Sequence, residues 1–173
     1  MSDQFAHQLR IDQIRDGDRL ELSADESERA AIAERLGLPS IKCLNAQVTL
    51  SRSGETIRAD GRLAASLDQS CVVTGDPVAA HVDERFAIQF VAEPKYGVPD
   101  DEIELGEADC DTVFYDGAMI DLGEALADTL ALSLDPYPRS AGVDAALKEA
   151  GVMSEEEASP FAVLAKLRKS DET

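Results

Sequence analysis

The sequence predicts an α+β fold in which helices cover an antiparallel sheet, and it leaves open whether the sheet is barrel-like. Two patterns support this fold class: apolar and polar residues alternate between 45 and 90, and an apolar residue recurs every four positions between 121 and 134. With 173 residues, 44% of them apolar, the chain can bury one substantial core. We therefore predict a single domain over residues 1–173.

The clearest predicted helix is central to the chain and spans about Asp121–Leu134. Asp121 and Glu124 have the spacing of a capping box, in which each side chain accepts a hydrogen bond from the other residue's backbone N–H. The helix should end before Pro136, because proline cannot continue the hydrogen-bond ladder. One apolar stripe is formed by Leu122, Leu126, Leu130 and Leu134. This stripe predicts a core helix without a chemical role.

The residues before this helix predict short N-terminal elements and a central sheet. Weak alternation at 9–11 and 20–22 predicts two short strands, and a Ser23–Glu26 capping box predicts a helix over 25–36. Period-two alternation then predicts three longer strands with one apolar face each, at 45–51, 57–67 and 78–90.

An acidic segment follows the predicted sheet. Residues 93–116 contain nine acidic residues against Lys95, a net charge of −8, and are interrupted by proline and glycine. We predict a long acidic loop here, with a short strand at Thr112–Tyr115. Residues 140–159 form a polar connection with one helical turn near Leu147, and a last helix begins at Ser159.

Charge and composition limit the classes of partner and location. The chain has 35 acidic and 16 basic residues, a net charge of −19, which repels phosphate at long range and attracts basic partners. We therefore expect no binding to DNA. No apolar run is long enough for a membrane span, and the first residues lack the pattern of a secretory signal. Three scattered cysteines suit a reducing compartment, so we predict a cytoplasmic protein.

Three stretches of the chain carry a family resemblance. They are IDLGEALADTLALSLDPYPR at 120–139, SPFAVLAKLR at 159–168 and SCVVTGDPVAAHVDERFAIQF at 70–90. Taken in their order along the chain, they resemble the YceD family of large ribosomal RNA subunit accumulation proteins. The resemblance implies a non-enzymatic factor that supports large-subunit ribosomal RNA accumulation and ribosome biogenesis.

The resemblance does not extend to a metal site. Many YceD relatives carry a pair of cysteines separated by two residues in the central segment, but here Thr74 stands where the second would follow Cys71. A single thiol cannot supply half of a tetrahedral zinc site, and Cys43 and Cys110 do not restore the spacing. We predict no metal and no cofactor, with Cys71 as a small buried apolar residue.

Motifs for catalysis are nearly absent from the sequence. There is no glycine-rich phosphate loop and no nucleophile motif, and His7 and His81 are the only histidines. The acidic segment offers one alternative, because Asp100, Asp101 and Glu102 could hold a divalent cation, although their spacing fits no EF-hand. The alternative function is therefore a metal-dependent hydrolase or nuclease that uses the acidic loop.

Basic residues on the predicted sheet give candidates for RNA binding. Alternation places Arg58 and Arg62 on the polar face of one strand, and His81 and Arg85 can share that face if the next strand joins the same sheet. The same pattern fits a solvated face on which nearby aspartates pair with these arginines. The RNA-binding candidates are Arg58, Arg62, His81 and Arg85.

The family function could therefore act through two kinds of partner. In one version the acidic loop binds a basic ribosomal protein, through the candidates Asp100, Asp101, Glu102 and Glu104. In the other version the arginine face binds large-subunit ribosomal RNA. An interaction module without any link to RNA remains a third possibility.

Overall fold

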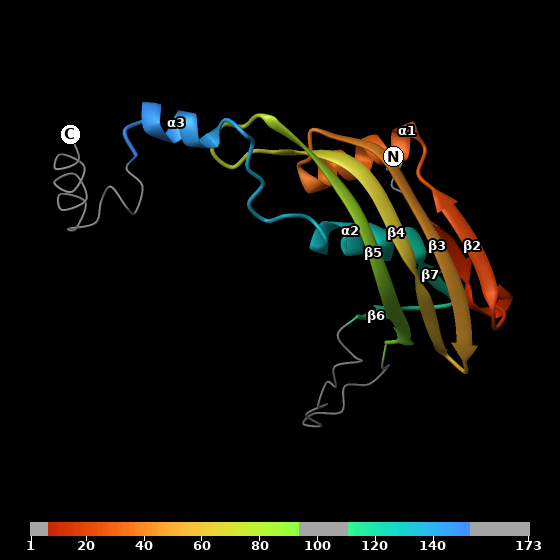
Figure 1. The fold of residues 1–173 in the computed structure, drawn as a ribbon. Helices are drawn as coiled ribbons and strands as arrows, with labels where there is room; N and C mark the ends of the chain where they lie inside the picture. Colours follow the sequence, from red (N-terminus) through yellow and green to blue (C-terminus); the bar gives the residue numbers. More distant parts are fainter. Residues whose placement is uncertain (1–6, 94–110, 153–173) are drawn as a thin grey trace, which may run out of the picture. The chain divides into compact units, whose positions relative to one another are not determined.

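The computed structural model describes residues 7–93 and 111–152 (Figure 1). The chain divides into two compact units, Met1–Gln69 with Ala79–Pro136 and Ser70–Val78 with Tyr137–Thr173. The described helices are η1 (a 3₁₀ helix, Ile11–Gln13), α1 (Glu26–Leu36), α2 (Leu122–Leu132) and α3 (Val143–Glu149). The described strands are β1 (Gln8–Arg10), β2 (Asp18–Ser23), β3 (Ser40–Ser53), β4 (Thr56–Ser70), β5 (Pro77–Ala92), β6 (Thr112–Tyr115) and β7 (Met119–Asp121).

Five strands form one open sheet in the order β2-β3-β4-β5-β6, which confirms the α+β class. The pairs β2–β3 and β3–β4 are antiparallel, and the contacts Ser66–His81 and Arg62–Asp83 show that β4 and β5 are antiparallel too. The sheet does not close into a barrel, because β2 and β6 lie at opposite edges.

The pairing of β6 corrects the prediction of an antiparallel sheet. The described strand β6 has the predicted bounds Thr112–Tyr115, but it runs parallel to β5. A parallel neighbour needs a crossover of a dozen or more residues, and the connection between Ala92 and Thr112 is long enough for one.

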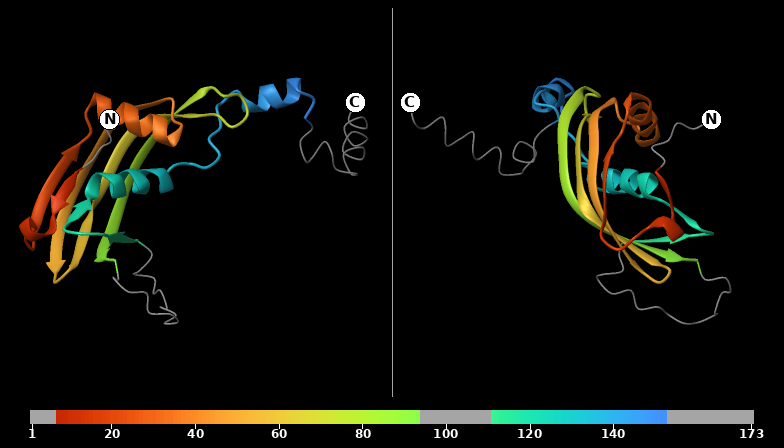
Figure 2. Two further views of the ribbon diagram at one scale, coloured as in Figure 1. Left: turned by 180° about the vertical axis from the view of Figure 1, so that it is seen from behind. Right: turned by 90° about the vertical axis from the view of Figure 1, so that its right-hand side faces the viewer.

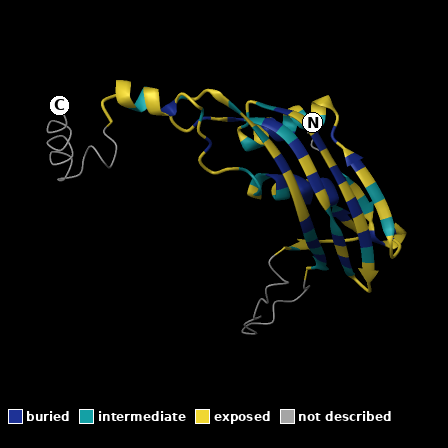
Figure 3. Cartoon of the chain, viewed as in Figure 1, coloured by how far each residue is buried: buried dark blue, intermediate teal, exposed yellow. Residues whose placement is uncertain are grey.

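Alternation along the strands separates a buried face from a polar face. Buried and exposed residues follow each other in bands along β3, β4 and β5 (Figure 3). The buried face supplies large side chains such as Leu44, Leu50, Ile57, Leu63 and Phe90 to one core. The other face, which we call the outer face, carries the polar and charged side chains of these strands.

Helices α1 and α2 lie on the same side of the curved sheet (Figure 2). Helix α2 buries Leu122, Leu126 and Leu130 fully, so the predicted apolar stripe is a core element. The helix ends at Leu132, two residues before the predicted Leu134, which is only partly buried against the core. The Pro136 ring disfavours helical geometry just upstream, and this is consistent with the earlier end.

The helix caps show where the sequence pattern was right and where it was wrong. Asp121 accepts a hydrogen bond from Glu124 N at 3.0 Å, as the first half of the predicted box requires, and a second from His7 N at 3.2 Å. The Ser23–Glu26 box is wrong, because Ser23 is still paired with β3 as the last residue of β2. The capping box of α1 instead joins Asp25 and Glu28, with two bonds of 2.8 Å.

The N-terminal strand β1 and the strand β7, which directly precedes α2, form a short two-stranded sheet. Strands β1 and β7 pair antiparallel, with Leu9 opposite Ile120. The predicted strand over 9–11 is one residue out of place, since Ile11 begins the 3₁₀ helix η1 and is buried there. The start of α2 is held by His7, the residue directly before β1, whose carbonyl oxygen accepts a hydrogen bond from Leu122 N at 3.0 Å.

The second unit is small. Within its described residues, the turn after β4 lies against the segment that follows α2, with Val72 N donating to Pro138 O at 2.9 Å. Helix α3 supplies one buried residue, Val143. The predicted turn near Leu147 is this helix, whereas the helix predicted from Ser159 lies outside the described residues. Whether the two units make a single domain over 1–173 stays a prediction.

Candidate binding surface

The outer face brings all four RNA-binding candidates together. Arg58 and Arg62 project from β4, and β5 pairs with β4, so His81 and Arg85 share the same polar face. All four side chains belong to exposed residues. The conditional part of the prediction, that the two strands are neighbours, is confirmed.

Two of these arginines are engaged by carboxylates. Arg58 Nε lies 2.9 Å from Asp60 Oδ2 on its own strand, and the Arg62 guanidinium binds both carboxylate oxygens of Asp83 on β5. The bond from Arg62 lowers the pKa of Asp83, and the same bond raises the pKa of Arg62. Both members of this pair are therefore charged at neutral pH.

The other two candidates differ from each other. His81 Nδ1 lies 3.1 Å from the hydroxyl oxygen of Ser66 across the β4–β5 pair. Arg85 is exposed and makes no ion pair with any residue that the structure describes. A phosphate group could reach Arg85 without displacing a carboxylate, whereas at Arg58 and Arg62 it would have to compete with one.

A shallow pocket on the outer face has a balanced charge. It has a volume of about 370 Å³ and extends across β2, β3 and β4. Its charged lining consists of Arg19, Glu21, Asp60 and Arg62, two of each sign. This hollow therefore offers neither a strong site for phosphate nor one for a basic chain.

The partner-binding candidates of the acidic loop lie outside the described residues. These are Asp100, Asp101, Glu102 and Glu104. The structure does describe both ends of the predicted loop, where Glu93, Asp111 and Asp116 are exposed. Both ends lie at the same end of the sheet, because Glu93 N donates to Tyr115 O at 2.9 Å.

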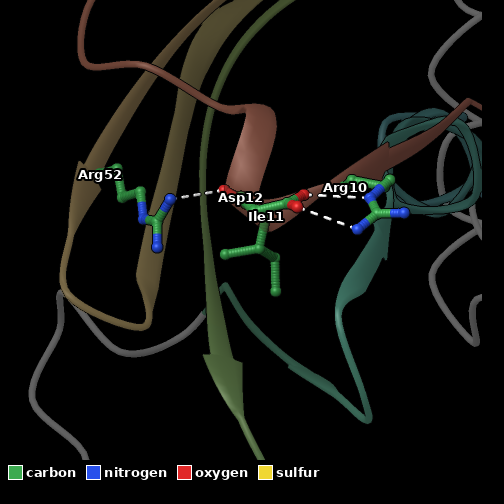
Figure 4. A network of polar contacts seen from close by, with 4 residues as sticks. All are labelled: Arg10, Ile11, Asp12 and Arg52. Atoms are coloured by element: carbon green, nitrogen blue, oxygen red, sulfur yellow. Dashed lines mark hydrogen bonds and ion pairs between the residues drawn. The ribbon is translucent and has the colours of Figure 1, made fainter.

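An open pocket of about 600 Å³ lies at this end of the sheet. We call it the acidic pocket, since its charged lining consists of Asp12, Glu55, Glu93 and Asp116 with Arg52 as the single base. Arg52 donates to Ile11 O at 2.6 Å, while Asp12 pairs with Arg10 (Figure 4). Arg52 also donates to Gly54 O at 3.0 Å. Sequence pattern alone does not predict this pocket, because its residues come from four separate parts of the chain.

Cys71 is buried as predicted, but its sulfur has polar neighbours. The residue is 3% exposed, and Ser140 N donates to its Sγ at 3.4 Å. A hydrogen bond from the Thr74 side chain, helped by backbone N–H groups of the same turn and of Ser140, lowers the pKa of Cys71 from 9.0 to about 6. The interpretation of Cys71 as a purely apolar residue is therefore incomplete.

Within residues 7–93 and 111–152, no three His, Cys, Asp or Glu side chains cluster as a metal site would require. In the same described part, none of the helices has the length and apolar character needed to cross a bilayer. The cation site proposed at Asp100, Asp101 and Glu102 falls outside these residues.

Comparison with known proteins gives one match. Residues 59–168 match the model of the family described as large ribosomal RNA subunit accumulation protein YceD. The matched range begins within β4 and contains β5, β6, β7, α2 and α3, and it includes all three stretches that carried the resemblance. Comparisons with curated proteins and with solved structures found no match.

Proposed function

We propose that this chain, which belongs to the YceD family of large ribosomal RNA subunit accumulation proteins, acts in ribosome biogenesis by binding a basic ribosomal protein and without catalysis. The family description supports the link to large-subunit RNA. The observation that carries the choice of partner is the pairing of Arg58 with Asp60 and of Arg62 with Asp83.

Electrostatics favours a basic protein over RNA. Guanidinium groups that already bind carboxylates gain little from phosphate, because one anion replaces another. The whole chain carries −19, so RNA is repelled at long range while a basic protein is attracted. In this proposal the acidic surface of the chain covers the positive charge of a ribosomal protein before that protein is assembled into the ribosome. The chain itself acts in the cytoplasm.

A test compares two variants against two partners. Asp100→Asn with Asp101→Asn and Glu102→Gln should slow association with a basic large-subunit ribosomal protein more than it speeds dissociation. Arg58→Ala with Arg62→Ala should leave this binding unchanged. Binding should also weaken steeply with salt, because exposed charges are screened within about 8 Å at physiological ionic strength. Stopped-flow association kinetics at several salt concentrations measures both effects.

Direct RNA binding is the second candidate, and Arg85 favours it. This arginine has no carboxylate partner among the described residues and shares the outer face with Arg19. If RNA is the partner, Arg85→Ala should weaken binding of large-subunit RNA and the acidic-loop variant should not. The proposal of a basic protein partner fails if that RNA binds tightly and the ribosomal protein does not bind.

The metal-dependent hydrolase or nuclease remains the alternative from another class. It predicts that the purified chain holds a divalent metal and cleaves RNA. Elemental analysis and a cleavage assay with added Mg²⁺ distinguish it from a binding factor.

A further inference from the structure

Strand β6 leaves an apolar edge on the sheet. In the described part of the chain it is the last strand of the sheet, with β5 as its neighbour. Val113 is 38% exposed and Phe114 is 62% exposed, so two adjacent large apolar residues face solvent on a strand of four residues. An exposed edge of this kind is a template on which a further strand can pair.

The hydrogen bonds of β6 show which backbone groups point outward. Gln89 N donates to Asp111 O and Glu93 N donates to Tyr115 O, both at 2.9 Å. In a parallel pair every second residue bonds to the same neighbour, so Asp111, Val113 and Tyr115 bond toward β5. The N–H and C=O groups of Phe114 therefore point away from β5, beside an exposed aromatic ring.

The charges around this edge select the partner. Asp111 and Asp116 flank β6, and the acidic pocket adjoins its end through Tyr115 and Asp116. The carboxylates of Glu55, Glu93 and Asp116 make no ion pair with a described residue, and the guanidinium of Arg52 is bonded to carbonyl oxygens. A second copy of this chain would bring another −19 to the edge, so it is disfavoured as the occupant.

We propose that the β6 edge binds an extended basic segment of a partner protein, which adds a strand to the sheet. Backbone hydrogen bonds to Phe114 hold the segment, its apolar side chains cover the Phe114 ring, and a Lys or Arg side chain enters the acidic pocket. This inference rests on the proposed function, because it names where a basic ribosomal protein would be held.

The probe for this site is a ten-residue peptide of alternating lysine and valine, used with the full-length protein and measured by fluorescence anisotropy. Phe114→Ser removes the ring and keeps the backbone donor, whereas Phe114→Pro removes both. We expect Phe114→Ser to weaken binding severalfold and Phe114→Pro to weaken it by about a further tenfold, as for the loss of one backbone hydrogen bond. Leu132→Ser is the matched control, since Leu132 is 85% exposed on α2, and it should not change binding.

Two altered peptides keep the test valid if Phe114→Pro disturbs β6 itself. A peptide methylated at alternate backbone nitrogens keeps its charge and side chains but cannot form the ladder, so its binding should be lost. A peptide with glutamate in place of lysine should not bind. The proposal is overturned if the methylated peptide binds as tightly as the parent peptide, or if the parent peptide does not bind. It is also overturned if Phe114→Pro weakens binding of single-stranded RNA as much as it weakens binding of the peptide.

Failure of the β6 site and failure of the proposed function can be distinguished by experiment. If deletion of the protein lowers large-subunit RNA in cells while Phe114→Pro restores it fully, the function stands and the β6 site fails. If the peptide binds as expected and the deletion has no effect on RNA, the site stands and the function fails.

Discussion

Truncation of Leu126 should destabilise the fold strongly. The side chain of Leu126 is 0% exposed and lies in the core between α2 and the sheet. Leu126→Ala removes three carbon atoms, which corresponds to about 2.4 kcal/mol of transfer free energy at about 0.8 kcal/mol per methylene. The cavity that remains raises the total loss into the range of about 2–5 kcal/mol. For a chain of this length the melting temperature should fall by about 4–20 °C.

The same helix supplies the control for this prediction. Leu132→Ala makes the identical chemical change at a position that is 85% exposed, so its free energy of unfolding should change by less than about 0.5 kcal/mol. Urea titration of both variants, followed by far-UV circular dichroism, measures the difference between buried and exposed sites. Equal losses for the two variants, or a loss below about 0.5 kcal/mol for Leu126→Ala, would refute the assignment of the stripe to the core.

Two further predictions concern a tight contact in the sheet and the buried thiol. Gly61→Ala should cost about 1–3 kcal/mol by overpacking, because the new Cβ would lie 2.6 Å from Phe86 Cζ and also against the Gln47 carbonyl oxygen, and thermal unfolding measures the loss. The Cys71 thiolate should absorb near 240 nm with a midpoint near pH 6, and Thr74→Val should raise that midpoint. The pKa of Cys71 in the folded protein lies below the ordinary value of 9.0. The thiolate's contribution to stability is therefore fully present above pH 9.0 and is lost as the pH falls through about 6. A midpoint near 9 in the parent protein would contradict the hydrogen bonding assigned to this sulfur.

Much of the candidate surface could be predicted from the alternation of residue types. Period two alone places Arg58 and Arg62 on one exposed face, and the structure has them there. It could also suggest the Arg58–Asp60 pair, whose members are two positions apart on one strand. The Arg62–Asp83 pair depends on the register between β4 and β5, which local pattern does not specify.

The sequence by itself determined the local elements of this protein. The leucine spacing of α2 and the alternation of β3 to β5 follow from which side chains must leave water, and this is a property of neighbouring residues. Only the tertiary structure decided the parallel direction of β6, the acidic pocket and the polar contacts of Cys71 with Ser140. These depend on residues that are distant along the chain, and the path of the backbone rather than local hydrophobicity brings them together.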